Sequence, residues 1–87
     1  MSLDDEYKCY LVRFETQFEN IEEANIAEDL TANLSLIKEN YLFATLKTIP
    51  WELCSDIKKL ERLRELENIM FELMVLVKEY ESLRSNQ

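Results

Sequence analysis

The sequence contains no glycine and only one proline, Pro50, among its 87 residues. Tight β-hairpin turns depend on glycine because their central positions favour positive φ, so this chain is poorly suited to antiparallel sheet. Leu, Glu and Lys, which favour helix, are abundant. Hydrophobic residues make up 47% of the chain, which argues against intrinsic disorder. We therefore predict an all-α fold in one helical domain that spans residues 1–87.

Two helices are predicted in the first half of the chain, over about residues 3–22 and 26–47. Ser2 is a suitable N-cap for the first helix, and Asn25 with Glu28 has the spacing of a capping box that would open the second. The alternative is one unbroken helix over residues 3–47. Steps of three and four place apolar residues on one face of each helix. These are Tyr7, Leu11, Phe14, Phe18 and Ile21, then Ile26, Leu30, Leu34, Ile37, Tyr41 and Ala44. Leu36, Leu42, Phe43 and Leu46 form a second apolar face on the second helix, and a helix that is apolar on two sides is usually buried between neighbours.

Pro50 predicts the start of a third helix, over about residues 50–84, because proline is tolerated in the first turn of a helix and disrupts its interior. Trp51 follows directly. Its ring could fill the corner between the second and third helices, or it could anchor a partner protein. We favour the corner, because a large aromatic ring at a helix start usually packs locally.

The third predicted helix carries more apolar residues than one face can hold. One stripe alternates steps of three and four over more than two heptads, which is typical of a coiled-coil seam. Phe71 lies beside this stripe and is the best candidate for an exposed contact. The predicted partner-binding seam, stripe and neighbours together, comprises Leu66, Ile69, Met70, Phe71, Leu73, Met74, Leu76, Val77, Tyr80 and Leu83.

The predicted length of the third helix favours association. A helix of about 35 residues spans about 50 Å, whereas a compact chain of this size is about 30 Å across. The helix would overrun such a globule, so it either bends or packs on another chain. We predict a three-helix bundle or helical hairpin with a long coiled-coil-like third helix, in an oligomer.

Several kinds of chemistry lack their usual residues. The chain has no histidine, which removes the commonest general base and the Ser-His and Cys-His nucleophile pairs. Without glycine there is no phosphate-cradling loop. Cys9 and Cys54 are far apart in sequence and, without histidine, give zinc too few ligands. We therefore predict no catalytic residue, no cofactor and no metal.

Charge is unevenly distributed along the chain, whose net charge is −8. Residues 1–29 hold nine acidic and two basic residues, a net of −7, so the rest of the chain is nearly neutral. Nucleic acids and anionic membranes require a basic face, so neither is a predicted partner. Two lone cysteines, no signal peptide and no long apolar run predict an intracellular, reducing location, in the cytoplasm or nucleus.

Two functional hypotheses follow, both of them protein–protein interaction. In the first, the protein is a small helical subunit that associates with itself or with helices of a larger assembly. In the second, it is an acidic inhibitor, immunity protein, antitoxin or chaperone that neutralises a basic protein. A monomer that folds alone is a third possibility. The predicted acidic contacts of the second hypothesis are Glu15, Glu19, Glu22, Glu23, Glu28 and Asp29.

Overall fold

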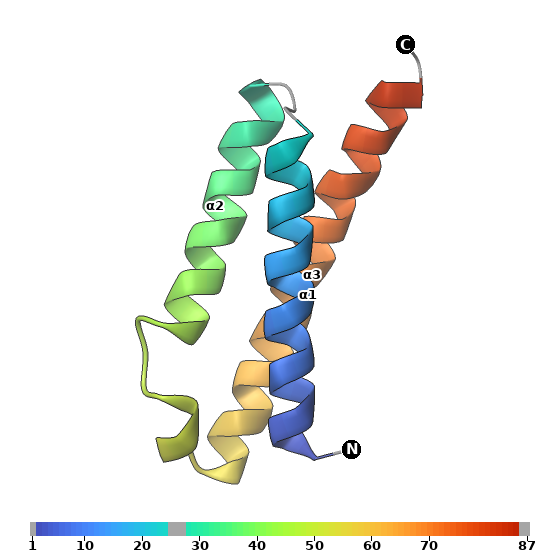
Figure 1. Ribbon diagram of the computed structural model, residues 1–87. Helices are drawn as coiled ribbons and strands as arrows, with labels where there is room; N and C mark the ends of the chain where they lie inside the picture. The colour runs from blue at the N-terminus through green and yellow to red at the C-terminus, as the bar shows by residue number, and fades with distance from the viewer. Residues whose placement is uncertain (1, 25–27, 86–87) are drawn as a thin grey trace.

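A computed structural model describes residues 2–24 and 28–85 (Figure 1). Over these residues the chain forms three α-helices and a short 3-10 helix, which confirms the all-helical prediction. The helices are α1 (Leu3–Glu23), α2 (Glu28–Thr45), η1 (Trp51–Leu53) and α3 (Asp56–Ser85).

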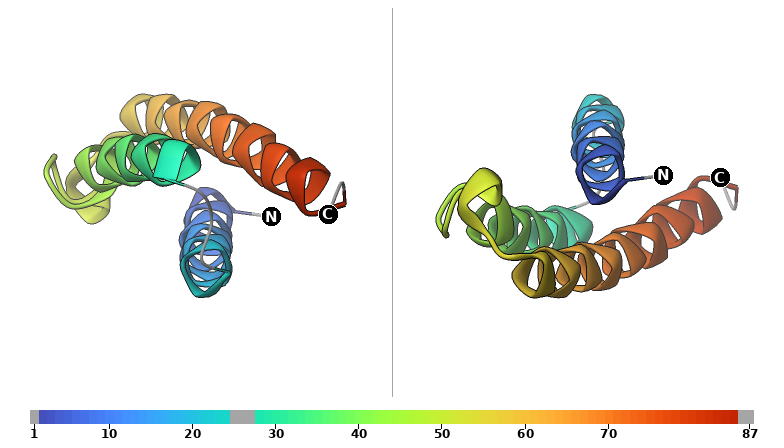
Figure 2. Two further views of the ribbon diagram at one scale, coloured as in Figure 1. Left: turned by 90° about the horizontal axis from the view of Figure 1, so that it is seen from above. Right: turned by 90° about the horizontal axis from the view of Figure 1, so that it is seen from below.

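The three helices run up, down and up, and they are not arranged symmetrically. Helices α2 and α3 lie side by side as an antiparallel layer, and α1 packs on one face of that layer (Figures 1 and 2). In the part of the chain that the structure describes, no helix covers the opposite face. The core therefore lies between α1 and the α2–α3 layer.

The first two helices are separate, and the alternative of one unbroken helix is wrong. The Ser2 hydroxyl accepts a hydrogen bond from the Asp5 N–H at 3.2 Å and opens α1. At the other end, the Ala24 N–H donates to the carbonyls of Asn20 and Ile21, which closes the last turn. The predicted cap at Asn25, and the predicted start at residue 26, lie outside the described residues.

The third helix begins later than predicted, at Asp56 rather than at Pro50. Pro50 instead precedes the single turn of η1, and Cys54 then returns to an extended conformation. Ser55 is the effective cap, because its hydroxyl accepts a hydrogen bond from the Lys58 N–H at 3.3 Å. A serine cap satisfies a free helix N–H, whereas proline only removes one, so the long helix starts after Ser55.

Trp51 lies at the corner between α2 and α3 and packs within the chain, as the sequence indicated, but its ring contacts are with α1 and α3. Its ring is buried and stacks on Tyr7 of α1, with centroids 4.1 Å apart and planes 2° from parallel. Its indole Nε1–H donates to the Asp4 carboxylate at 2.7 Å, and the Lys59 ammonium lies 3.5 Å from the same oxygen. The indole hydrogen bond, followed by the charge of Lys59, lowers the pKa of Asp4 below its ordinary value. This corner therefore ties the start of α1 to the loop and to α3.

The core contains one face of each helix. Phe14, Leu66 and Leu73 are fully buried. The Phe14 ring lies 4.6 Å from that of Tyr41, and the Phe18 ring packs edge-on against Tyr41 at 5.5 Å. The remaining buried members of this cluster are Tyr7, Ile21, Leu34, Ile37, Ala44, Trp51, Leu63, Met70 and Leu76.

The protein is more elongated than the compact globule that we expected. Its extents are 48 × 25 × 18 Å and its radius of gyration is 14.3 Å, against about 12 Å for a compact chain of this length. The 30 residues of α3 span about 45 Å and therefore fit along the long axis. The expectation that α3 overruns its own chain is wrong, because α1 and α2 lie lengthwise beside it. Only its C-terminal end stands apart from the other helices (Figure 1).

Truncation of Leu66 tests where the core lies. Leu66→Ala should lower the free energy of unfolding by about 2–5 kcal/mol, because it leaves a cavity between three helices. Val12 is exposed on α1, so Val12→Ala should change the free energy of unfolding by no more than about 0.5 kcal/mol. Urea unfolding followed by circular dichroism measures both, and equal effects would contradict the described core.

Candidate protein-binding surfaces

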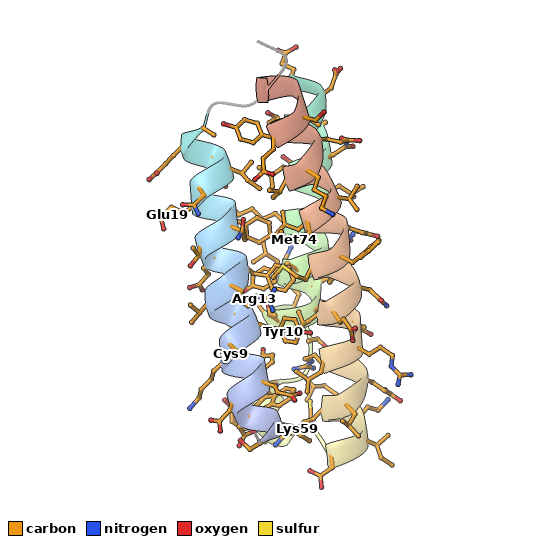
Figure 3. All side chains as sticks on the ribbon, turned by 90° about the vertical axis from the view of Figure 1, so that its right-hand side faces the viewer. Cys9, Tyr10, Arg13, Glu19, Lys59 and Met74 are labelled. Atoms are coloured by element: carbon orange, nitrogen blue, oxygen red, sulfur yellow. The ribbon has the colours of Figure 1, made fainter. Side chains whose placement is uncertain are left out.

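The predicted partner-binding seam mostly packs inside the chain. Leu66, Met70, Leu73 and Leu76 are buried in the core. Ile69, Met74, Val77 and Tyr80 are half-buried, and the side chain of Leu83 lies outside those described. Figure 3 shows Met74 of α3 facing the side where Tyr10 and Arg13 project from α1. The four buried residues therefore present no surface to a partner in this structure, because α1 and α2 already cover them.

Phe71 is the exception within the predicted seam, as its position beside the stripe indicated. Its side chain is 70% exposed. Other exposed apolar residues accompany it on α2, on the loop and on α3, and we call the set the open face of the α2–α3 layer. The open face comprises Leu36, Phe43, Ile49, Leu53, Ile57, Leu60, Phe71 and Val75.

Two shallow hollows lie along the open face, between α2 and α3. The first, of about 370 Å³, is lined by Leu36, Phe71 and Val75, with Glu72 and Glu79 on its rim. The second, of about 270 Å³, lies nearer η1 and has an apolar and a charged part. Its lining includes Phe43, Ile49, Leu53, Lys58, Glu61, Arg62 and Glu65.

Arg62 is a buried charge that sequence patterns did not reveal. Only 7% of the residue is exposed, and its Nη2 donates to the Thr48 hydroxyl at 3.5 Å. Its Nη1 is buried without a hydrogen-bond partner, which is costly for a charged group. Burial raises the pKa of Tyr7, and the nearby Arg62 charge opposes that rise. Arg62 therefore lies between the Tyr7–Trp51 stack and the second hollow.

A groove between α1 and α2 collects three of the six predicted acidic contacts. Glu15, Glu19 and Glu22 lie on α1 and line a groove of about 360 Å³, which we call the acidic groove. Figure 3 shows Glu19 projecting from α1 away from α3. The groove is also lined by Tyr7, Leu11, Phe18, Lys38, Tyr41, Leu42, Thr45 and Leu46.

The other three predicted acidic contacts lie elsewhere. Glu23 is the last residue of α1, while Glu28 and Asp29 open α2. All three are exposed, and none lines the acidic groove. Glu28 and Asp29 lie in the first turn of α2, where the helix dipole favours negative charge. The negative charges of Glu28 and Asp29 therefore stabilise the start of α2.

One ion pair partly neutralises the acidic groove. The Lys38 ammonium of α2 lies 2.6 Å from a carboxylate oxygen of Glu22 on α1, and 5.8 Å from the centre of the Phe18 ring. Both charged side chains are about half exposed, so the pair contributes no more than about 1 kcal/mol. Glu15 and Glu19 remain as the net negative charge of the groove.

Tyr41 forms part of the floor of the acidic groove, and this position raises the pKa of its phenol. Burial raises the pKa of Tyr41 to about 12, and the negative charge of Glu15 adds to the rise. The phenol is therefore neutral at physiological pH. Its ring packs on Phe14 and Phe18, so the floor is aromatic while the rim is acidic.

The described residues hold no group of three or more His, Cys, Asp or Glu side chains that could bind a metal ion. Cys9 is exposed on α1 and Cys54 is half-buried in the corner; both are free. Among the helices described here, none is long and apolar enough to cross a membrane.

No protein-family model, no curated protein and no solved structure matches this chain. The open face and the acidic groove are therefore the basis for a functional conclusion.

Titration of Tyr41 tests the electrostatics of the acidic groove. Its phenolate should form near pH 12, against 10.0 for an exposed tyrosine, because the charged form is desolvated and repelled by Glu15. Subtracting the ultraviolet titration of Tyr41→Phe from that of the wild type isolates this group. Glu15→Gln should move the midpoint downward.

The raised pKa of Tyr41 also fixes a pH dependence of stability. The unfolded chain has the lower pKa, so the stability that the neutral phenol contributes is complete below pH 10.0 and is lost between pH 10.0 and about 12. Tyr41→Phe should remove that part of the alkaline destabilisation. A Tyr41 that ionises at pH 10 would contradict the described groove.

Proposed function

We propose that this protein is a non-enzymatic protein–protein interaction module, a small helical subunit that associates with itself or with helices of a larger assembly through its open face. The supporting observation is the one-sided packing of α1. One face of the α2–α3 layer is buried by α1, whereas the other carries a row of exposed apolar side chains. Exposed apolar groups that cluster on one face are typical of interaction sites.

The distribution of apolar and charged residues supports this proposal. Of the described side chains of α1, Val12 is the one large apolar residue that is more than half exposed, whereas seven of the eight open-face residues are more than half exposed. Burial of this surface would stabilise a complex by about 25 cal/mol per Å² of apolar area. The free-energy cost of the entropy lost on association would offset part of that stabilisation. The acidic residues of α1 keep the opposite side of the molecule hydrated.

The proposal assigns no catalytic, cofactor-binding, metal-binding or nucleic-acid-binding role to any residue. It is supported by the absence of histidine and glycine from the sequence and by its net charge of −8. A coiled-coil pairing and an oligomeric state belong to the same proposal. The free thiols of Cys9 and Cys54 agree with a reducing compartment, the cytoplasm or nucleus.

Affinity capture with two matched variants tests the open face. Wild-type chain, Phe71→Glu and Val12→Glu are tagged and incubated with an extract of the cells that make the protein, and captured proteins are identified by mass spectrometry. Both variants replace an exposed apolar residue by the same charge, but on opposite sides of the molecule. Phe71→Glu should reduce capture at least about tenfold, because a charge is then buried at the interface.

Val12→Glu should capture as much as the wild type. Circular dichroism and urea unfolding establish that both variants are folded. If Phe71→Glu captured the same proteins in the same amounts as the wild type, the open face would not be the interaction site.

The acidic groove favours a second candidate function, the binding and neutralising of a basic protein. The observation that favours it is an aromatic floor beneath an acidic rim, which suits a basic side chain with a long apolar stem. Such binding should be fast at low salt and should weaken steeply as salt is raised.

Charge reversal on and off the groove tests this second candidate. Glu15→Lys with Glu19→Lys changes the net charge by the same amount as Glu28→Lys with Asp29→Lys, but only the first pair lines the groove. Capture of a basic protein at low salt should be lost in the first double variant and retained in the second. Equal capture by both would reject the groove, whereas equal loss would indicate attraction by net charge alone.

A further inference from the structure

The side of α3 that faces away from the core carries a regular stripe of exposed residues. Steps of three, four and seven place its members on one face of the helix. Ile57 is 71% exposed and Phe71 70% exposed, so neither belongs to the core of this chain. We call this set the outer stripe of α3: Ile57, Leu60, Arg64, Phe71, Val75 and Lys78.

The spacing of the outer stripe is the same in either direction along the helix, with steps of three, four, seven, four and three. Its apolar residues form two clusters, Ile57 with Leu60 near one end and Phe71 with Val75 near the other, about 20 Å apart along the helix. Three pairs of positions are equidistant from a point between residues 67 and 68: Ile57 and Lys78, Leu60 and Val75, and Arg64 and Phe71.

We propose that the occupant of the outer stripe is a second copy of this chain, packed antiparallel along α3 about a two-fold axis that passes between Glu67 and Asn68. This inference rests on the proposed function and names its partner. In a two-fold interface, residue i of one copy meets residue j of the other, and j meets i. The symmetric spacing of the outer stripe meets this requirement, because each of its positions then faces another position of the same stripe. Binding to an unrelated helix would not require symmetric spacing.

The antiparallel register gives each exposed apolar residue a partner. Leu60 meets Val75 of the second copy, and Arg64 lies over the ring of the second copy's Phe71, which is a favourable cation–π arrangement. Ile57 meets the alkyl stem of Lys78. Each contact forms twice, so at each end of the interface a Leu60–Val75 contact lies between an Ile57–Lys78 contact and an Arg64–Phe71 contact.

The charge distribution favours the same arrangement. The net charge of −7 in residues 1–29 belongs largely to α1, which lies across the core from the outer stripe. Pairing through α3 therefore keeps the two α1 helices on the far sides of the dimer. Near the axis, Arg64 of each copy lies about one helical turn from Glu67 of the other, so opposite charges alternate there.

Sedimentation equilibrium of the purified chain tests the dimer. Each copy carries −8, so association should strengthen severalfold between about 0.01 M and about 1 M salt, as the screening length falls from about 30 Å to about 3 Å. Phe71→Lys should raise the dissociation constant about 100-fold or more, because each introduced ammonium faces Arg64 of the other copy and both copies of the contact are lost. Val12→Lys, on α1, should leave the dissociation constant unchanged.

Cysteine cross-linking tests the register, in a background with Cys9→Ser and Cys54→Ser that must first retain the wild-type mass and helicity. With a short bis-maleimide, Asn68→Cys alone should cross-link, because residue 68 lies beside the axis. Lys78→Cys alone should not, but it should cross-link when mixed with Ile57→Cys. Cross-linking of Lys78→Cys to itself would indicate a parallel pair and would overturn the proposal.

The two proposals fail in distinguishable ways. A chain that remains monomeric at every concentration and salt overturns the homodimer, but capture of a different protein that depends on Phe71 would still support the interaction module. If Phe71→Lys leaves the dissociation constant unchanged and Phe71→Glu leaves the captured proteins unchanged, both proposals are wrong. A dimer that Phe71→Lys and Val12→Lys weaken equally also overturns the proposed interface.

Discussion

Phe14 of α1 is buried with Leu66 and Leu73 of α3, and the rest of the structure depends on this packing. Because the described residues form three α-helices, α1 can cover one face of the α2–α3 layer and no more. The apolar residues on the covered face become core, and those on the other face remain exposed. The open face is therefore a direct consequence of having too few helices to enclose the layer.

The corner around Trp51 determines how α1 is placed on the layer. Stacking of Trp51 on Tyr7, with Asp4 accepting the indole hydrogen bond, joins residues that are far apart in sequence. The same corner sets the course of the loop that exposes Ile49 and Leu53 on the open face. Arg62 lies buried behind it, bonded to Thr48, so the corner combines aromatic packing with a charge that is not fully satisfied. The contact between Trp51 and Tyr7 thus positions both α1 against the core and the loop of the open face.

The two candidate surfaces differ in what they offer a partner. The open face offers mainly apolar area, which suits a helix of the same kind, including a second copy of α3. The acidic groove offers charge above an aromatic floor, and Lys38 already neutralises part of that charge. Salt acts oppositely on the two modes, because it relieves repulsion between like-charged copies and screens attraction to a basic protein. The effect of salt on binding therefore distinguishes the two surfaces.

The sequence by itself determined the helical class, the first cap at Ser2 and one buried stripe each on α1 and α2, because absent glycine and regular apolar spacing are local properties. It also indicated that Trp51 packs within the chain and that Phe71 is exposed. It wrongly indicated that the second apolar face of α2 is buried, since Leu36, Phe43 and Leu46 are exposed. It could not assign the faces of α3, whose apolar residues extend around much of the helix, so Leu66 and Leu73 were predicted to bind a partner. Only the tertiary structure decided that these residues are core and that Ile57, Phe71 and Val75 are not. The physical reason is that periodicity shows which residues share a face, whereas exposure depends on which neighbouring helix covers that face.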